Sequence, residues 1–199
     1  MKKIREEKAC TKVEGSETGP AEQELIRAAR GGDKGAFGQL IRGHQKRLFR
    51  FVYGLVGSFD QAEDIVQEAF VKAYEALDKF ETGRDFYPWL ATIARNKALN
   101  MIAREERKES LDKIQEQGFD TPTGQADPLD QLLADENQRR FYAALKGLPE
   151  TYRIVFVMRH FEEMSYDQIS EQLKIPPGTV DSRLYRARQL LVEALKDLL

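Results

Sequence analysis

Between residues 60 and 80, small and apolar side chains recur every three or four positions, a spacing that restricts this segment to an amphipathic helix packed in a core. The buried stripe consists of Ala62, Val66, Ala69, Ala73, Leu77 and Phe80. Asp60 and Glu63 stand three residues apart at its start, which predicts a capping box. A helix with one apolar stripe must be covered by neighbours, so we expect a helical bundle.

The opposite face of the same helix is acidic with an apolar centre. It carries Asp64, Gln67, Glu68, Val71 and Glu75. A valine among carboxylates favours a docking site for a basic helix of a partner protein. The alternative is the solvated outer face of a bundle helix.

A second long helical pattern covers residues 85–108 and begins with the aromatic residues Phe86, Tyr87 and Trp89. Its inner face is Leu90, Ala94, Ala98, Met101 and Ile102, and its outer face is Trp89, Thr92, Asn96, Asn100 and Arg107. The outer hydroxyl and amides can hydrogen-bond to bases, the aromatic rings can stack on unpaired bases, and Arg95, Lys97 and Arg104 can reach phosphates. We therefore expect a surface for single-stranded nucleic acid. The alternative is an amphipathic helix whose Trp89 closes a small core.

Two helices are expected before the stripe. Residues 21–29 predict a short helix, and Asp33 is placed to cap a longer helix that runs to about Gly57. His44, in the longer helix, is expected at the surface. Residues 1–22 mix charged residues with Gly, Ser, Thr and Pro without periodicity, which predicts a disordered leader.

Charge divides the chain into blocks. The totals are balanced, with 31 basic and 33 acidic residues, but residues 109–138 hold eight acidic residues and one basic residue. Glycine and proline interrupt the helical period in the same stretch, so residues 109–130 predict an acidic flexible linker. The fold class is therefore all-α, with two small helical domains at residues 23–108 and 131–199.

The second domain contains the pattern of a helix-turn-helix. Ser165 and Gln168 predict a capping box for a short helix, and Pro177 suits the first turn of the next one. In that next helix Val180, Leu184, Ala187 and Leu191 face inward, while Ser182, Tyr185, Arg186 and Gln189 face outward. Outward residues of these types can read base edges in a major groove, and Arg183 can hold a phosphate. An ordinary helical hairpin with a basic face is the alternative.

Other features of the sequence exclude several classes of function. The only cysteine, Cys10, allows no internal disulfide, and no apolar run can span a bilayer, so we expect a cytoplasmic protein. His44 and His160 lie in different domains without a cluster of metal ligands, and no phosphate-binding glycine motif or nucleophile with a base is found. We expect no catalytic residue, no cofactor, no metal and no enzyme activity, with His160 at a helix surface.

Three strings in this order make the chain resemble the extracytoplasmic-function (ECF) sigma factors of bacterial RNA polymerase: DQAEDIVQEAFVKAY, FYPWLATIARN, and SYDQISEQLKIPPGTVDSRLYRAR preceded by LPETYR. The resemblance implies a region 2 bundle that docks its acidic face on the clamp helices of the polymerase β′ subunit. It also implies that the loop at residues 81–86 and the helix after it capture the melted minus-ten strand. The minus-ten residues implied are Phe86, Tyr87, Thr92, Arg95, Asn96, Lys97 and Asn100.

In the same family the C-terminal unit, region 4, reads the minus-35 element as duplex DNA. The residues implied are Arg159, Thr179, Ser182, Arg183, Tyr185, Arg186 and Gln189. Relatives often have a basic residue where this chain has Asp181, which leaves the minus-35 sequence open. The resemblance further implies the β subunit, promoter DNA and an anti-sigma factor as partners of a monomer, and a linker that runs towards the polymerase active-site cleft.

Two other classes of function compete with this interpretation. A free-standing operator-binding regulator would use the same helix-turn-helix, but such proteins usually dimerise on paired half-sites, and the sequence has no clear dimerisation heptad. That class also leaves the aromatic and amide helix unexplained. A helical adaptor that binds only protein would use the acidic patch as its main site.

Overall fold

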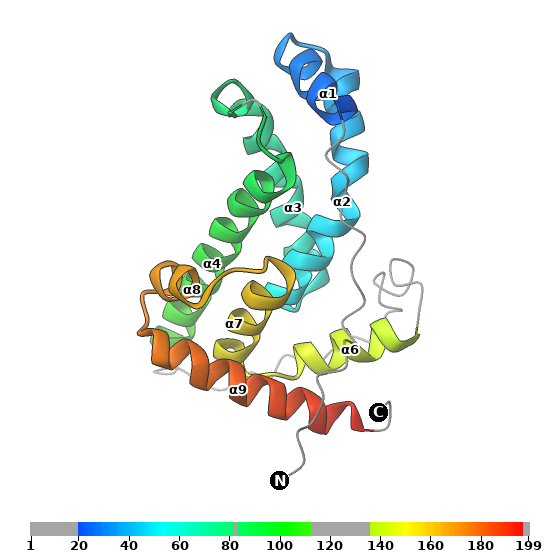
Figure 1. Ribbon diagram of the computed structural model, residues 1–199. Coiled ribbons are helices and arrows are strands. Elements are labelled where there is room, and N and C mark those ends of the chain that lie inside the picture. The colour runs from blue at the N-terminus through cyan, green and yellow to red at the C-terminus, as the bar shows by residue number, and fades with distance from the viewer. Residues whose placement is uncertain (1–19, 82, 113–135, 197–199) are drawn as a thin grey trace.

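Every regular element in the described part of the chain is helical. The computed structural model describes residues 20–81, 83–112 and 136–196. The helices are α1 (Pro20–Arg30), α2 (Lys34–Val56), α3 (Phe59–Glu75), the 3-10 turn η1 (Leu77–Lys79), α4 (Phe86–Asp112), α6 (Glu136–Lys146), α7 (Glu150–Phe161), α8 (Tyr166–Leu173) and α9 (Pro177–Ala194). Figure 1 shows α1 to α4 as one bundle, with α6 to α9 packed against one end of it. The all-α prediction is confirmed.

The first bundle, α1 to α4, is held by the predicted stripe of α3. All six stripe residues are buried, from Ala62 to Phe80. The Asp33 carboxylate accepts hydrogen bonds from the backbone N–H groups of Gly35 and Ala36 and so caps α2, as predicted. At the other end of α2, Gly57 has a φ of 73° and closes the helix in the left-handed conformation.

Several predicted helix ends were wrong. Helix α3 starts at Phe59 after Ser58, whose side chain makes no capping hydrogen bond, so Asp60 lies inside the first turn and the predicted Asp60–Glu63 capping box does not form. Helix α1 begins at Pro20, so the predicted leader of residues 1–22 overlaps a helix. Helix α4 continues past residue 108 to Asp112. The rest of the predicted linker, at residues 113–130, and Cys10 lie outside the described residues.

His44 was also predicted wrongly. It is buried rather than exposed, and its Nε2 lies 2.7 Å from Oε1 of Glu22 on α1. Its ring packs near the rings of Phe86 and Tyr87, with centroid distances of 5.5 and 5.9 Å. The reason is that α1 and the start of α4 both cover α2 at this level, which the period of α2 alone does not reveal.

The C-terminal domain contains the predicted helix-turn-helix in α8 and α9. Ser165 and Gln168 form the predicted capping box, with N···O distances of 2.8 and 3.2 Å. Lys174 ends α8 in the left-handed conformation, and Pro177 opens α9. The inward residues of α9, Val180, Leu184, Ala187 and Leu191, are all buried.

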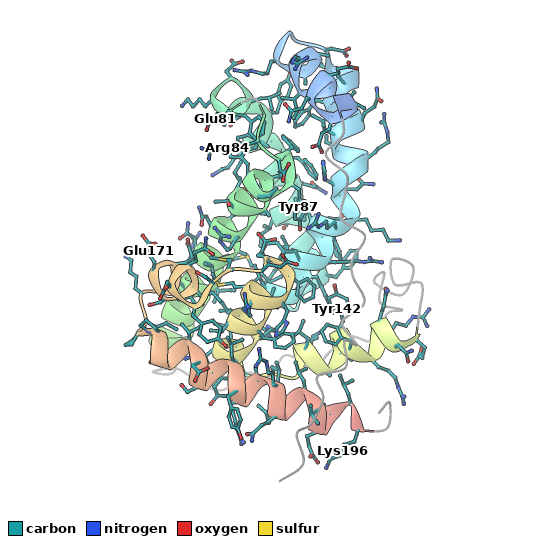
Figure 2. The ribbon with its side chains drawn as sticks, in the orientation of Figure 1. Glu81, Arg84, Tyr87, Tyr142, Glu171 and Lys196 are labelled. Carbon is teal, nitrogen blue, oxygen red and sulfur yellow. The ribbon has the colours of Figure 1, made fainter. Side chains whose placement is uncertain are left out.

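The two domains share one continuous core. Tyr53 of α2 packs on Tyr142 of α6 with ring centroids 5.8 Å apart, and Arg153 Nε of α7 donates to the Leu55 carbonyl oxygen over 3.1 Å. Figure 2 shows Tyr142 on the side of α6 that faces the bundle. The fold therefore brings the C-terminal domain against α2 and α4.

None of the described helices combines the length and the apolarity that crossing a membrane requires.

Candidate nucleic-acid interface

The acidic face of α3 is open to solvent, as predicted. Its five residues, Asp64, Gln67, Glu68, Val71 and Glu75, are all exposed. Val71 has 58% of its surface exposed and lies among these polar side chains. The carboxylates around it make this a surface suited to a partner with both apolar and basic groups.

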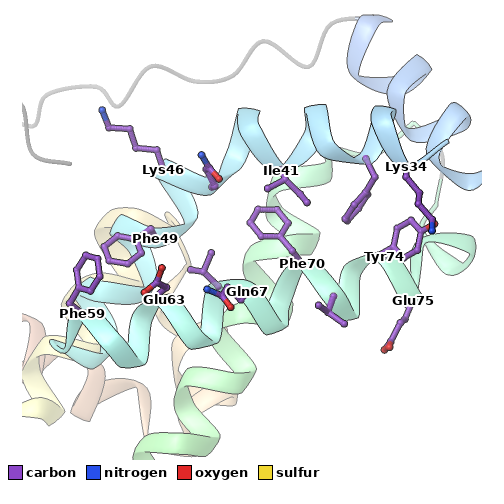
Figure 3. Close-up of a pocket in the computed structure, with 14 residues that line it drawn as sticks. Lys34, Ile41, Lys46, Phe49, Phe59, Glu63, Gln67, Phe70, Tyr74 and Glu75 are labelled. Atoms are coloured by element: carbon purple, nitrogen blue, oxygen red, sulfur yellow. The ribbon is translucent and has the colours of Figure 1, made fainter. Parts of the chain in front are cut away.

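An apolar hollow of about 800 Å³ extends the acidic face of α3 towards α2. Figure 3 shows Ile41 of α2 facing Phe70 of α3 at its centre, Phe49 beside Phe59 at one end, and Tyr74 with Glu75 at the other end. Sequence reasoning missed this hollow. The available signal was Phe70 and Tyr74, two aromatic residues four positions apart beside Val71 and outside the buried stripe.

A second hollow, of about 690 Å³, lies at the turn between η1 and α4. Trp89 is half-buried there against Phe80 and Phe86, with centroid distances of 5.0 and 5.6 Å, and it lines the hollow together with Arg84 and Thr92. Figure 2 shows Glu81 and Arg84 at the end of the bundle remote from α9. Cations beside an indole can hold a base and its phosphate.

Helix α1 braces this turn. Gln23 Nε2 donates to the Arg84 carbonyl oxygen over 3.0 Å, and the Gly83 N–H donates to Gln23 Oε1 over 3.2 Å. Gly83 has a φ of 94°, a conformation that favours glycine. These hydrogen bonds therefore hold the turn that forms the hollow in the protein without a ligand.

Two predicted minus-ten residues are core residues instead. Phe86 is fully buried and Tyr87 is 5% exposed, so neither ring can stack on a base in this fold. Tyr87 lies under the guanidinium of Arg47, whose Cζ is 3.7 Å from the ring centroid. The physical reason is that α4 enters the bundle at Phe86, and its first turn packs on α2. Of the three aromatic residues at the start of α4, only Trp89 reaches the surface.

The remaining polar residues of α4 differ in their exposure and in the hydrogen bonds and ion pairs that they already make. The Thr92 hydroxyl donates to the Pro88 carbonyl oxygen over 2.8 Å, and Lys97 forms an ion pair with Glu68 of the acidic face. Asn96 is exposed, but its Oδ1 accepts a hydrogen bond of 3.1 Å from Gln172 of α8. Asn100 is exposed.

Arg95 is buried by the C-terminal domain, contrary to its predicted place on a nucleic-acid surface. Its Nη1 lies 3.8 Å from Oε2 of Glu162 and 3.5 Å from the sulfur of Met164. Burial raises the pKa of the Glu162 carboxyl to about 7, against the opposing attraction of Arg95 and Arg47. Burial also lowers the pKa of the Arg95 guanidinium.

The outward face of α9 carries a connected polar array. Arg186 Nη1 donates to Gln189 Oε1 over 3.1 Å, and Gln189 Nε2 donates to the Tyr185 hydroxyl over 2.9 Å. Tyr185 is 63% exposed, and Ser182 on the same face is exposed as well. Such an array holds side chains in position for the edges of bases in a major groove.

The other residues predicted to read duplex DNA are less exposed than this array. Thr179 and Arg183 are half-buried. Arg159 is also half-buried, and its Nη1 donates to the carbonyl oxygens of Glu163 and Met164 over 3.3 and 2.9 Å. Arg159 therefore holds the loop between α7 and α8. His160 is exposed, as expected.

Comparison with known families and proteins decides the class. The family model for Sigma-70 region 2 matches residues 40–108, and the model for Sigma-70, region 4, matches residues 138–191. The RNA polymerase sigma-H factor of Pseudomonas aeruginosa is 35% identical over an alignment of 184 residues that covers 89% of this chain and 95% of that protein. The chain belongs to the ECF sigma factors.

Further ECF sigma factors are similar at comparable levels. SigW of Bacillus subtilis is 32% identical, and the alignment covers 87% of this chain and 96% of SigW. The sigma-E factor of Escherichia coli is also 32% identical, and the alignment covers 89% of this chain and 96% of that protein. These relatives are transcription factors rather than enzymes. Within the described residues, no three His, Cys, Asp or Glu side chains come together as a metal site.

Two solved structures of sigma factors have a similar fold. The Bartonella quintana sigma factor RpoE in complex with the anti-sigma factor NepR has a TM-score of 0.56 at 28% identity, covering 80% of this chain and 96% of that one. CnrH in complex with the cytosolic domain of CnrY has a TM-score of 0.54 at 25% identity, with coverage of 89% and 98%.

Proposed function

We propose that this ECF sigma factor binds the RNA polymerase core through the acidic face of α3 and places two separate DNA-reading surfaces on a promoter. Asp64, Gln67, Glu68, Val71 and Glu75 are the docking residues on the clamp helices of the β′ subunit. Their exposure around an apolar valine supports this assignment. The region 2 bundle takes residues 23–108, and the region 4 domain takes residues 131–199.

The minus-ten element is read as a melted strand at the first turns of α4. An extruded base enters the hollow beside Trp89, where Arg84 and Lys79 meet its phosphates. Thr92, Asn96, Lys97 and Asn100 contact the strand along α4, and Arg95 joins them when the C-terminal domain moves away. The energy of unstacking the base, a few kcal/mol, is recovered by these contacts.

The minus-35 element is read as duplex DNA by α9. The observation that carries the whole proposal is the exposed array of Tyr185, Gln189 and Arg186 on the second helix of a helix-turn-helix. Ser182 and Arg186 meet base edges, while Thr179, Arg183 and the free part of Arg159 hold the backbone. The exposed carboxylate of Asp181 accepts a hydrogen bond from a cytosine amine or repels a phosphate, so it shifts the preferred sequence.

The partners follow from this role. They are the β′ and β subunits of the core enzyme, promoter DNA and an anti-sigma factor of the kind seen with the related structures. The linker runs inside the polymerase towards the active-site cleft. The protein acts in the cytoplasm as a monomer, and it has no cofactor and no catalytic residue, since RNA synthesis belongs to the polymerase.

Run-off transcription with core polymerase on a library of promoters tests the proposal. Asn96→Ala is expected to impair opening or minus-ten choice, and Arg186→Ala to relax choice at one minus-35 position by about 1–3 kcal/mol. Arg188→Ala is the matched control, because it removes a neighbouring exposed arginine that is expected to hold only a phosphate. Wild-type promoter selectivity in both test variants would contradict the DNA-reading roles proposed for Asn96 and Arg186. If core polymerase gains no start-site choice from this chain, the proposal as a whole fails.

Gel-shift at matched salt gives a second test. The domains carry little excess positive charge, so the isolated protein is expected to bind promoter duplex weakly at physiological salt and tightly only with core enzyme. Nanomolar specific binding by the protein alone would instead favour an operator-binding regulator.

A further inference from the structure

Helix α1 contacts the wall of the hollow beside Trp89, although it lies outside the Sigma-70 region 2 match, which begins at residue 40. The contact is made by the side-chain amide of Gln23, which uses both of its polar ends. Its Nε2 donates to the Arg84 carbonyl oxygen over 3.0 Å, and its Oε1 accepts from the Gly83 N–H over 3.2 Å. A side-chain amide can make both bonds at once, whereas a carboxylate or an apolar side chain of the same length cannot.

A second contact from the same helix holds the other side of the turn. Arg30 Nη2 donates to the Asp78 carbonyl oxygen of η1 over 2.7 Å. Gln23 and Arg30 are two helical turns apart, so both side chains leave α1 on the same face. Helix α1 is itself fixed to α2, because Glu22 Oε1 lies 2.7 Å from Nε2 of the buried His44. The turn between η1 and α4 is therefore tied at both ends to a helix that is anchored in the bundle.

The two walls of the hollow are held in different ways. The Trp89 ring packs on two buried phenylalanine rings, so core contacts fix its position. Gly83 and Arg84 are exposed, and a side chain added at Gly83 would meet nothing within 4 Å. The ion pair between Arg84 and Glu81 is exposed too, so it adds little stability. An exposed turn with few apolar contacts opens easily, so the hydrogen bonds from α1 are needed to tie this wall to the bundle.

On this basis we infer that Gln23 is a positioning residue for minus-ten recognition: with Arg30 in support, it holds Gly83 and Arg84 at the spacing from Trp89 that an extruded base requires. This inference rests on the proposed function of the hollow. Gln23 acts through the turn and not by touching DNA. A binding site discriminates sharply when its walls are held in the productive geometry, and it loses less conformational freedom when its ligand binds.

Gln23→Met tests the inference in the full chain, since methionine keeps the length of the side chain and loses both hydrogen bonds. Glu24→Met is the matched control, because Glu24 is the next residue on α1 and is exposed. Arg30→Met removes the second contact, and Arg27→Met, at another exposed arginine of α1, is its control. Run-off transcription with core polymerase measures the choice of base at each minus-ten and minus-35 position. Trp89 is the only tryptophan in the chain, so acrylamide quenching of its fluorescence reports directly on the hollow.

Gln23→Met is expected to lower base discrimination at a minus-ten position by about tenfold relative to Glu24→Met, since two hydrogen bonds of ordinary net strength are lost. Discrimination at the minus-35 element should stay at the wild-type level, and acrylamide should quench Trp89 more strongly. Arg30→Met should change both minus-ten discrimination and quenching in the same direction relative to Arg27→Met.

Unchanged minus-ten discrimination in Gln23→Met would overturn the inference, whatever the quenching shows. An equal loss at the minus-ten and minus-35 elements would overturn it as well, because Gln23 would then only stabilise the fold. The wild-type chain decides the proposed function separately. If the wild type gives core polymerase its choice of start site and Gln23→Met does the same with full discrimination, the failure belongs to Gln23 alone.

Discussion

Gly54 of α2 lies so close to α7 that a methyl group added to it would come within 3.3 Å of a Val157 methyl carbon and 3.5 Å of Leu145 Cδ2. Glycine weakens a helix interior by about 1 kcal/mol relative to alanine. Here the missing side chain lets the backbones of two domains approach. The packing of the two domains at this point therefore depends on one residue without a side chain.

Gly54→Leu is expected to separate the unfolding of the two domains. The four added carbons meet Val157 and Leu145, so α7 must move off α2, while the contacts within each domain stay in place. Thermal unfolding followed by circular dichroism should change from one transition to two. Gly43→Leu, on the same helix with nothing within 4 Å, should keep a single transition. A single transition in both variants would show that the domain contact adds no cooperativity.

Stability is expected to fall as pH rises towards neutrality because of Glu162. Burial raises its pKa from an ordinary value of 4.5 to about 7, so the folded state binds the proton more tightly than the unfolded state. The stabilisation is fully present below about pH 4.5 and is lost by about pH 7, and its size is about 3 kcal/mol at most. The groups that face the carboxyl are Arg95 and Tyr87 of α4 and Arg47 of α2.

Urea unfolding of the wild type and of Glu162→Gln across this pH range measures the effect. Glutamine cannot titrate, so the difference in unfolding free energy between the two proteins isolates Glu162 from other carboxylates. The wild type should lose stability relative to the variant as pH rises. A difference that stays constant with pH would mean that Glu162 is ionised in both states.

Removing the cap of α2 is expected to lower the unfolding free energy more than removing the carboxylate near the start of α3. Asp33→Ala deletes two hydrogen bonds to backbone N–H groups and should lower the unfolding free energy by about 1 kcal/mol. Asp60→Ala removes only a favourable charge in the first turn, so a loss below about 0.5 kcal/mol is expected. Chemical denaturation of both variants measures these values, and equal losses would contradict the observed start of α3.

Val71→Asp is expected to weaken binding to core polymerase by about tenfold or more, since it removes an apolar contact worth about 1.5 kcal/mol or more when fully buried. Val71 is exposed, so the fold should not change. Val192→Asp is a suitable control because Val192 is 54% exposed on α9, outside the proposed docking face. Equilibrium titration of labelled protein with core enzyme gives both affinities. Wild-type affinity of Val71→Asp would show that Val71 does not belong to the docking site.

Features that depend on local spacing could be predicted from the sequence. The buried stripe of α3, the Asp33 cap, the Ser165–Gln168 capping box and the inward residues of α9 all rest on contacts within a few residues. The exposed face of α3 follows from the same period. These features predict the all-α class and the exposed faces of α3 and α9.

Features created by distant segments could not be predicted in this way. His44 is buried because Glu22 lies across it, and Arg95 because Glu162 comes from the other domain. Helical period places Arg95 beside the outward residues, but it carries no information about a loop 67 positions later in the chain. Phe86 and Tyr87 were predicted wrongly for a related reason, since the contact between the first turn of α4 and α2 joins segments that are distant in the sequence.

The hydrogen bond from Gln172 to Asn96 has a consequence for timing. It engages the Oδ1 of Asn96, one of the residues proposed for the melted strand, whereas Tyr185 and Arg186 stay open to solvent in the same molecule. Engagement of upstream double helix can therefore come first, before any rearrangement. On the proposed roles, an unpaired strand that bonds to the same Asn96 oxygen must first displace Gln172 from it.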